Sequence, residues 1–370
     1  MRRTGLAELP LHGGKCPPWL FSRMKRLGGA IAEIIVKERG RREFLRRLGD
    51  PFFFQSLGCV LGYDWHSSGL TTVTMGALKE ALAERNLGVA VCGGKGRVSR
   101  RTPDEIEMLA EAFSLSTGQV ERLKYASRMA AKVDNACVQD GYQLYHHTFV
   151  VSEDGDWAVI QQGMHGRLAR RYHWVSEGVR SFVEEPHSGI ASDRMEEAVL
   201  DMTARESAEA RKVSVDLVRE DPRKLLPLIR SARQRILDEY LEIEPRLKVL
   251  VMPTGHEITG LSEKTLAALR RAYEIQPQNY EELVAIQGVG PASIRALALV
   301  SALIYGKPPS WRDPARYSFA HGGKDGVPYP VDRRTYQKTI EVLEEAIREM
   351  DAGREEKLGA LRRLHEFLGE

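Results

Sequence analysis

The sequence predicts an α+β fold, in which a mixed N-terminal domain with a small β-hairpin or sheet precedes a mostly helical domain. Apolar residues recur at helical spacing over most of the first 136 residues. Residues 142–164 are instead rich in aromatic and β-branched side chains around an Asp-Gly pair, which is typical of a β-hairpin. From about Glu196 the helical pattern returns and continues to the end of the chain.

Each element follows from a local pattern. Residues 89–92, Val-Ala-Val-Cys, indicate a short buried strand. Thr102 and Ser116 are the expected N-caps of two helices, and the second helix has Gln119 as its capping-box partner and runs to about Ala136. The remaining elements are expected as helices at 19–48, 51–62 and 72–84 and as strands at 142–151 and 157–164.

A chain of 370 residues is longer than one small core usually holds, so more than one domain is expected. The pattern changes near residue 196, and a stretch rich in proline and glycine ends near residue 331. We therefore expect a mixed α/β catalytic domain at 1–195, a helical domain at 196–331 and a C-terminal helical segment at 332–370.

The composition is that of an ordinary globular protein, with 42% hydrophobic and 28% charged residues. No apolar run approaches about 18 residues and the N-terminus lacks a secretion signal, so we expect a cytoplasmic protein that makes no membrane contact. The four cysteines lie far apart, which favours reduced thiols over disulfides or a zinc site. The net charge of +3 is too small to indicate nucleic acid without local basic clusters.

The most specific motif is a Gly-Val-Gly turn between two helical patterns, within residues 283–299. Glycines allow close backbone approach, and the first amides of the next helix are free to bind an anion. The segment resembles the helix-hairpin-helix element that holds the DNA backbone in repair and processing proteins. A plain helical hairpin is the alternative. The expected DNA-binding residues here are Gly288, Val289, Gly290, Ala292, Ser293 and Arg295.

A second basic, glycine-rich segment occupies residues 93–101, between the predicted strand and the next helix. Its glycines would let backbone amides approach an anion, and Lys95, Arg97 and Arg100 add positive charge. It contains neither GK[ST] nor GxGxxG, the spacings of nucleotide-binding loops. A DNA backbone is therefore the expected ligand, and a solvated basic loop is the alternative.

The hairpin holds the best catalytic candidates, His146 and His147, with Gln161 and Gln162 expected opposite them. Side chains alternate along a strand, so the two histidines should face opposite sides unless a bulge intervenes. Imidazole serves as a metal ligand or as a general acid or base near neutral pH. Packed structural histidines are the alternative.

Two carboxylates, Asp134 and Asp140, lie just upstream of the histidines. Together with His147 they are the expected ligands of a divalent metal ion, Mg²⁺ or Mn²⁺, which would activate water.

Polar loops supply further candidates, because function commonly lies on such segments. His66 and His12 are named as catalytic candidates, but capping of the next helix by Ser68 or Thr71 is the better explanation of the His66 loop. Lys324, about thirty residues after the Gly-Val-Gly turn, is an expected DNA contact. In the glycosylases that carry a helix-hairpin-helix, a catalytic Asp follows the hairpin by about twenty residues, and Asp313 lies near that distance.

Several short motifs, taken in their order along the chain, resemble the family designated domain of unknown function 763. The resemblance extends over nearly the whole chain and implies no particular activity; the family is found among thermophilic prokaryotes. The motifs that carry it lie at 9–14, 64–69, 145–147, 157–164 and 318–326.

These observations together predict a DNA-processing or repair enzyme, specifically a metal-assisted nuclease that hydrolyses phosphodiester bonds. A helix-hairpin-helix glycosylase that uses Asp313 and a non-catalytic DNA-binding protein are the alternatives. The sequence leaves the oligomeric state open.

Overall fold

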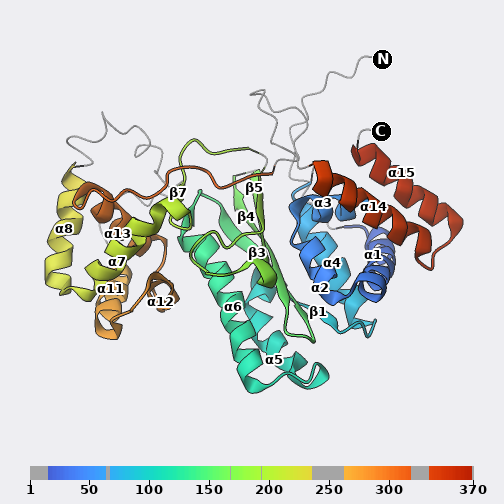
Figure 1. Ribbon diagram of the computed structural model, residues 1–370, viewed down its shortest axis with the longest axis horizontal. Helices are drawn as coiled ribbons and strands as arrows, with labels where there is room; N and C mark the ends of the chain where they lie inside the picture. Colours follow the sequence, from blue (N-terminus) through green and yellow to red (C-terminus); the bar gives the residue numbers. More distant parts are fainter. Residues whose placement is uncertain are drawn as a thin grey trace, which may run out of the picture.

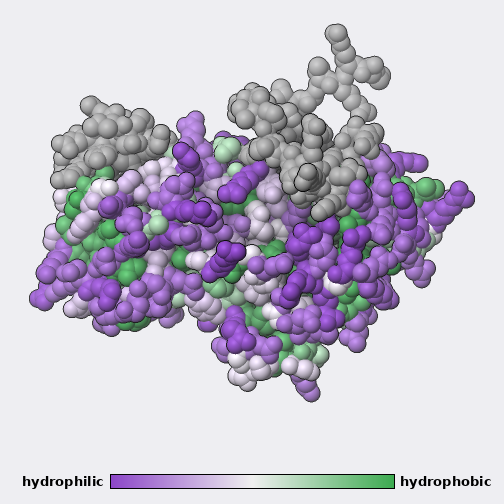
Figure 2. All heavy atoms as spheres, viewed as in Figure 1, coloured by the Kyte–Doolittle hydropathy of each residue, from purple (hydrophilic) through white to green (hydrophobic). Residues whose placement is uncertain are grey.

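The computed structural model describes residues 16–63, 67–166, 168–192, 194–235, 262–317 and 333–368. It confirms the α+β class, with helices on both sides of a small antiparallel sheet at the centre of Figure 1. Hydrophilic residues cover most of the face shown in Figure 2, with smaller hydrophobic patches between them. Within the described ranges, no helix is both long and apolar enough to cross a membrane.

The central sheet has five antiparallel strands in the order β1-β3-β4-β5-β6. The expected hairpin is confirmed, because β3 and β4 pair across a turn in which Gly155 has a φ of +84°, a value that suits glycine. Two strands that no sequence pattern indicated, β5 and β6, extend the hairpin. The strands are β1 (Val89–Lys95), β3 (Gln143–Ser152), β4 (Trp157–His165), β5 (Leu168–Val175) and β6 (Gly189–Ser192).

The two glutamines lie opposite the two histidines, as the sequence predicted, and the register pairs His146 with Gln162 and His147 with Gln161. Side chains at paired positions share a face of the sheet. The two histidines therefore lie on opposite faces. The register shifts between Leu144 and His146, before the two histidines. It therefore does not change their alternation, and one histidine lies on each face.

Helices α5 (Thr102–Ala112) and α6 (Thr117–Ala136) cover one face of the sheet. The capping box of α6 is confirmed, because the N–H of Gln119 donates to Ser116 Oγ and the Gln119 side chain accepts from the N–H of Ser116. Thr102 is not an N-cap. A 3-10 turn (Gly96–Arg101) leads directly into α5, and the Thr102 hydroxyl donates back to the Ser99 carbonyl at 2.7 Å.

The opposite face is covered by α2 (Arg41–Leu48), α3 (Pro51–Val60) and α4 (Gly69–Ala83), with α1 (Pro18–Arg39) packed on α2 and α4. The C-terminal helices α14 (Arg333–Glu349) and α15 (Arg354–Leu368) pack on α1 and α3, as Figure 1 shows. Their apolar side chains belong to the same core as Val150 and Ile160 of the sheet. The C-terminal segment therefore completes the N-terminal helical layer.

The helical region expected after residue 195 follows on the far side of α6. A two-stranded ribbon of β2 (Val138–Gln139) and β7 (Leu200–Asp201) ties it to the end of α6. One hydrophobic core continues from α6 into this region. Its helices are α7 (Ala208–Arg219), α8 (Pro222–Arg235), α11 (Glu263–Ile275), α12 (Tyr280–Ala285) and α13 (Pro291–Leu303).

Candidate functional site

The Gly-Val-Gly turn joins α12 to α13 at the surface. Gly288 is exposed and has a φ of +95°, and a Cβ there would lie 3.3 Å from Ala268 Cβ, so the position favours glycine. Val289 is buried and anchors the turn to the core. Gly290 is the N-cap of α13 and offers no side chain to the first amides, while Ala292 in that first turn is exposed. These amides are therefore available to an anion.

Two expected DNA contacts of this turn have side chains inside the protein. Arg295 is only 8% exposed, and its Nε donates to Gln139 Oε1 at 2.8 Å. Burial lowers the pKa of Arg295. Ser293 is 1% exposed. Neither side chain lies on the surface where a phosphate would bind, and Arg295 instead fixes α13 to the ribbon after α6.

Helix α6 and the strand β2 that follows it hold the turn in place. The Lys132 ammonium donates to the carbonyl of Ile286, just before the turn, and Gln139 Nε2 donates to the carbonyl of Pro291 at 2.9 Å, just after it. These contacts join distant parts of the sequence. They fix the place of the turn relative to α6.

The glycine-rich loop folds over the same helix, close to the histidines. Gly93 has a φ of +86°, and a Cβ on it would lie 2.4 Å from the carbonyl oxygen of His147, so glycine is needed where β1 passes β3. The 3-10 turn that follows encloses, with α5, α6 and β3, a pocket of about 390 Å³. Its lining includes Arg100, Ser127, Arg128, Tyr145, His146 and His147. The basic loop and the part of β3 that carries both histidines, predicted separately, thus meet at one pocket, although the two rings lie on opposite faces of the sheet.

Positive charge gathers around this pocket. The exposed cationic side chains of the loop and of the adjoining face of α6 are Lys95, Arg97, Arg100, Arg101 and Arg128. None of these side chains has a carboxylate within ion-pair distance in the described part of the chain, whereas Arg41 and Arg42 are paired with Asp154 and Asp156. Lys95 lies over the Tyr145 ring, 5.7 Å from its centroid. Positive charge without acidic partners favours an anionic ligand.

A buried chain of hydrogen bonds holds His147 on the α6 face of the sheet. Gln161 Nε2 donates to the carbonyl oxygen of Ala130 at 3.0 Å and to the carboxylate of Asp134. Both partners are acceptors only, so the amide oxygen of Gln161 must be the atom 2.8 Å from His147 Nδ1. His147 Nδ1 therefore carries the proton, and its Nε2 is left as an acceptor.

Ser127 of α6 completes this chain. Its Oγ lies 2.9 Å from His147 Nε2, and its hydroxyl donates to that nitrogen. Burial lowers the pKa of His147 and so favours the neutral imidazole, opposed by the hydrogen bond that the ring donates to Gln161 and by the charge of Asp134. A hydroxyl bonded to a neutral imidazole that an amide orients has the layout of a nucleophile, a base and an orienting group.

His146, on the other face, has no hydrogen bond to either ring nitrogen from any described residue. It is 2% exposed, and burial, with smaller contributions from His147 and Lys95, lowers its pKa to about 3. Gln162 opposite it donates to the Ser68 carbonyl at 2.8 Å and to the Tyr145 hydroxyl at 2.6 Å. The second glutamine thus ties β4 to the start of α4 and does not orient a histidine.

The expected metal ligands are each engaged elsewhere. Asp134 accepts from Trp174 Nε1 at 3.0 Å and from His187 Nε2 at 2.5 Å, besides Gln161. His147 uses both ring nitrogens in the bonds described above. Among the residues with described positions, no group of three or more His, Cys, Asp or Glu side chains is arranged to hold a metal ion.

Asp140, the third expected ligand, belongs to a buried ion pair. Arg170 Nη1 donates to it at 3.0 Å and the Tyr172 hydroxyl at 2.6 Å. Burial raises the pKa of Asp140 to about 6, although Arg170 and the hydrogen bonds oppose that shift. Asp313 accepts from the same guanidinium at 2.6 and 3.0 Å, and its side chain has no exposed surface. Asp313 is therefore placed to neutralise Arg170 in the interior, which does not suit the glycosylase alternative.

Three further expected site residues, His12, His66 and Lys324, lie outside the described residues.

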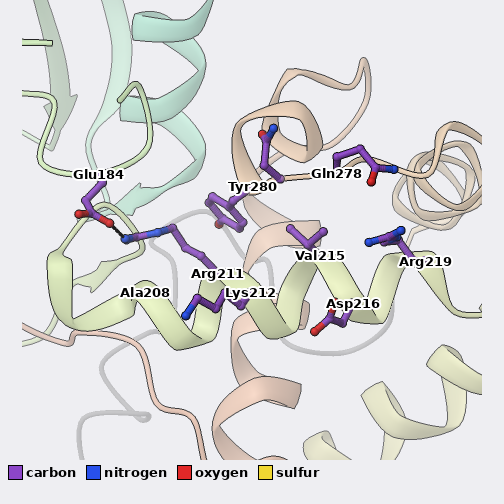
Figure 3. A pocket seen from close by; sticks show the side chains of 10 residues that line it. Glu184, Ala208, Arg211, Lys212, Val215, Asp216, Arg219, Gln278 and Tyr280 are labelled. Carbon is purple, nitrogen blue, oxygen red and sulfur yellow. Dashed lines mark hydrogen bonds and ion pairs between the residues drawn. The ribbon is translucent and has the colours of Figure 1, made fainter. Parts of the chain in front are cut away.

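A second pocket, of about 430 Å³, lies between α7 and the segment before α12 (Figure 3). Arg211 crosses toward Glu184 and forms an ion pair with it, and it also donates to the carbonyls of Met202 and Ala204. Acidic and basic side chains are mixed in this lining, and no histidine is among its described residues. The pocket beside α6 is therefore the better candidate site.

Sequence reasoning missed Ser127, Arg128 and Lys132. Arg128 and Lys132 are four residues apart, so they share one face of the predicted helix, a signal that was available. Ser127 carries no local signal, because its partner lies twenty residues away on a strand.

No curated protein and no solved structure matches this chain in comparison. A family model described as "Protein of unknown function (DUF763)" matches residues 5–331. This match covers most of the 370 residues, and the chain therefore belongs to the DUF763 family.

Proposed function

We propose that this protein binds DNA through the sugar-phosphate backbone and acts on phosphodiester bonds at the pocket beside α6. The observation that carries the proposal is a group of cations, none with a carboxylate partner among the described residues, around a pocket that His147 and Ser127 also line. An extended polyanion is the ligand that such a surface suits, because each neutralised phosphate releases counterions.

The turn between α12 and α13 supports an extended ligand. Lys132 holds the turn, while Ser127 and Arg128 line the pocket one helical turn earlier on α6. Arg128 thus lies between the two features on the surface of one rigid helix. A backbone held by the first amides of α13 would continue past Arg128 into the pocket.

The contacts of the expected metal ligands do not favour a metal-assisted reaction. Asp134, Asp140 and His147 already have hydrogen-bond partners, and Asp140 is paired with Arg170. The proposal therefore assigns the chemistry of the pocket to side chains of the chain itself. A DNA-binding protein without catalysis is the outcome expected if the bound DNA stays intact.

The binding proposal is tested at Gly290, where the backbone is extended and the space beside it is open. Asp and Asn both cap helices well, so Gly290→Asp and Gly290→Asn should fold equally well. Only the Asp variant puts a negative charge on the amides proposed to hold phosphate. We expect Gly290→Asp to weaken DNA binding at least tenfold relative to Gly290→Asn, measured by fluorescence anisotropy with labelled duplex and single-stranded DNA. Equal affinities would remove the turn from the interface.

Salt dependence tests the cationic surface. Affinity should fall steeply between about 50 and 200 mM salt. Arg128→Gln should reduce the slope of log affinity against log salt by about one, the value for one lost phosphate contact. Arg223→Gln is the control, because Arg223 is exposed on α8 and paired with Asp221. An affinity that does not change with salt would refute backbone binding.

A further inference from the structure

Ser127 differs from other buried serines of this protein. A serine inside an α-helix usually donates to the carbonyl four residues earlier. Ser56 donates to Phe52 in this way at 2.9 Å, and Ser214 donates to Ala210 at 2.7 Å. The hydroxyl of Ser127 is instead bonded to His147, on a strand of the sheet. Its hydroxyl group is directed by the tertiary structure.

The groups behind His147 fix the direction of proton transfer. The amide nitrogen of Gln161 donates to Ala130 and Asp134, so the amide oxygen is the atom that faces His147 Nδ1 and accepts its hydrogen bond. His147 Nε2 is thus free to take a proton from Ser127. An amide is a sufficient orienting group, since papain-like proteases use an asparagine in that place.

The pocket in front of Ser127 is built for an anion. Ser127 lines it together with Arg100 and Arg128, neither of which has a carboxylate partner among the described residues. A phosphodiester group that enters the pocket would have guanidinium donors for its non-bridging oxygens. Ser127 is only 3% exposed, but unlike Ser293 and Arg295 it lines this pocket, so it would face the bound phosphodiester.

We propose that Ser127 is the nucleophile, and His147 the general base, of a covalent phosphodiester cleavage that takes place in this pocket. The identity of the substrate as DNA rests on the proposed function, whereas the nucleophile and base rest on the geometry of α6 and β3. Sequence patterns and the family assign no role to Ser127.

In the first step, Ser127 Oγ attacks phosphorus and its proton passes to His147 Nε2. The bond from phosphorus to the leaving oxygen breaks, and the imidazolium returns the proton to that oxygen. The product is a phosphodiester between Ser127 and one end of the DNA, plus a free hydroxyl on the other end. Water, activated by His147, then attacks phosphorus, and the Ser127–phosphorus bond breaks to regenerate the hydroxyl.

The test uses the full chain with EDTA present and two substrates, labelled DNA and bis(p-nitrophenyl) phosphate. We expect the wild-type protein to hydrolyse the small diester, and Ser127→Ala to lose at least 100-fold of that rate while it keeps DNA affinity within twofold. Ser214→Ala, the same change at another buried helical serine, should keep full activity. Because burial lowers the pKa of His147, the rate should fall with acid only at a pH below that at which an ordinary histidine takes up a proton.

A second measurement tests the covalent step directly. DNA reactions quenched with acid should contain an adduct on the peptide that includes Ser127, found by mass spectrometry, and His147→Gln should form it far more slowly. The inference is overturned if Ser127→Ala retains the wild-type rate, or if the wild-type protein binds DNA but cleaves neither substrate. Hydrolysis of the small diester without DNA binding would instead overturn the proposed function and leave this inference standing.

Discussion

The two faces of the central sheet hold neighbouring histidines under opposite conditions. His147 faces α6 and is hydrogen-bonded through both ring nitrogens, by Ser127 and Gln161. His146 lies on the opposite face, is also buried, and has neither nitrogen bonded by a described residue. Burial alone therefore does not distinguish the histidine proposed to act as a base from the one that is only packed. The donors and acceptors around the ring make that distinction.

The difference continues into the layers behind each histidine. The α6 face combines a polar chain that ends at Asp134 with a pocket and unpaired cations. The α4 face is mainly a hydrophobic layer that the C-terminal helices complete. Chemistry is thus expected on the α6 face, and stability on the α4 face.

The largest expected effect is a difference in stability between variants of the two glutamines that face these histidines. Gln161→Met leaves His147 Nδ1, the Ala130 carbonyl and Asp134 each without one partner in the interior. Each such loss costs about 1–3 kcal/mol, and Asp134 keeps Trp174 and His187 as donors, so we expect the free energy of unfolding to fall by about 3–5 kcal/mol, toward the lower end of the sum. Gln162→Met should cost only about 1 kcal/mol, because Ser68 and Tyr145 are half-buried and can turn to water.

Denaturation of the two methionine variants by urea measures this difference. Methionine keeps the length of the side chain and removes its hydrogen bonds, so the two substitutions are chemically identical. Equal losses of unfolding free energy at both positions would show that the hydrogen-bonded chain on the α6 face contributes no more to stability than the bonds of Gln162.

The hairpin and the pairing of its histidines with glutamines could be predicted because they depend on neighbours in the sequence. The Asp154-Gly155 turn fixes the register, and the register fixes which residues face each other. The capping box at Ser116 was equally local. The separation of the two histidines onto opposite faces followed from strand alternation alone.

The remaining features depend on contacts that the sequence does not display. Ser127 gains its partner only when α6 packs on β3. The burial of Arg295 depends on Gln139, in a short ribbon with no pattern of its own. Likewise, the expected metal ligand Asp140 is near His147 in sequence, yet Arg170 from β5 neutralises it. Because the sequence pattern did not indicate β5, the contacts that its side chains make could not be predicted either.

A smaller effect is expected when each histidine is replaced by leucine. His147→Leu leaves the Ser127 hydroxyl and the Gln161 oxygen without partners, and we expect a loss of about 2–4 kcal/mol. His146→Leu removes no hydrogen bond and relieves the cost of burying a polar ring. Its free energy of unfolding should stay within about 1 kcal/mol of wild type, or rise. A large loss at His146 would reveal a partner for its ring and weaken the contrast between the faces.

The smallest expected effect is the change in the free energy of unfolding with pH that the buried, neutral histidines cause. Burial lowers the pKa of His146, His147 and His173 in the folded protein, whereas the unfolded chain titrates near 6.5. Below pH 6.5 the unfolded chain therefore binds more protons, and stability falls as the pH falls. Each histidine contributes at most about 1.4 kcal/mol per pH unit.

His146→Leu should make this decline shallower by the contribution of one histidine, with little change in stability at pH 8. Unfolding in urea at pH 8, 7, 6 and 5 measures both quantities in one series. Because the pKa of His146 is about 3, its contribution should persist over the whole acid range that the fold survives. An unchanged slope would mean that His146 is already protonated in the folded state, so that an acceptor must lie beside it on the α4 face.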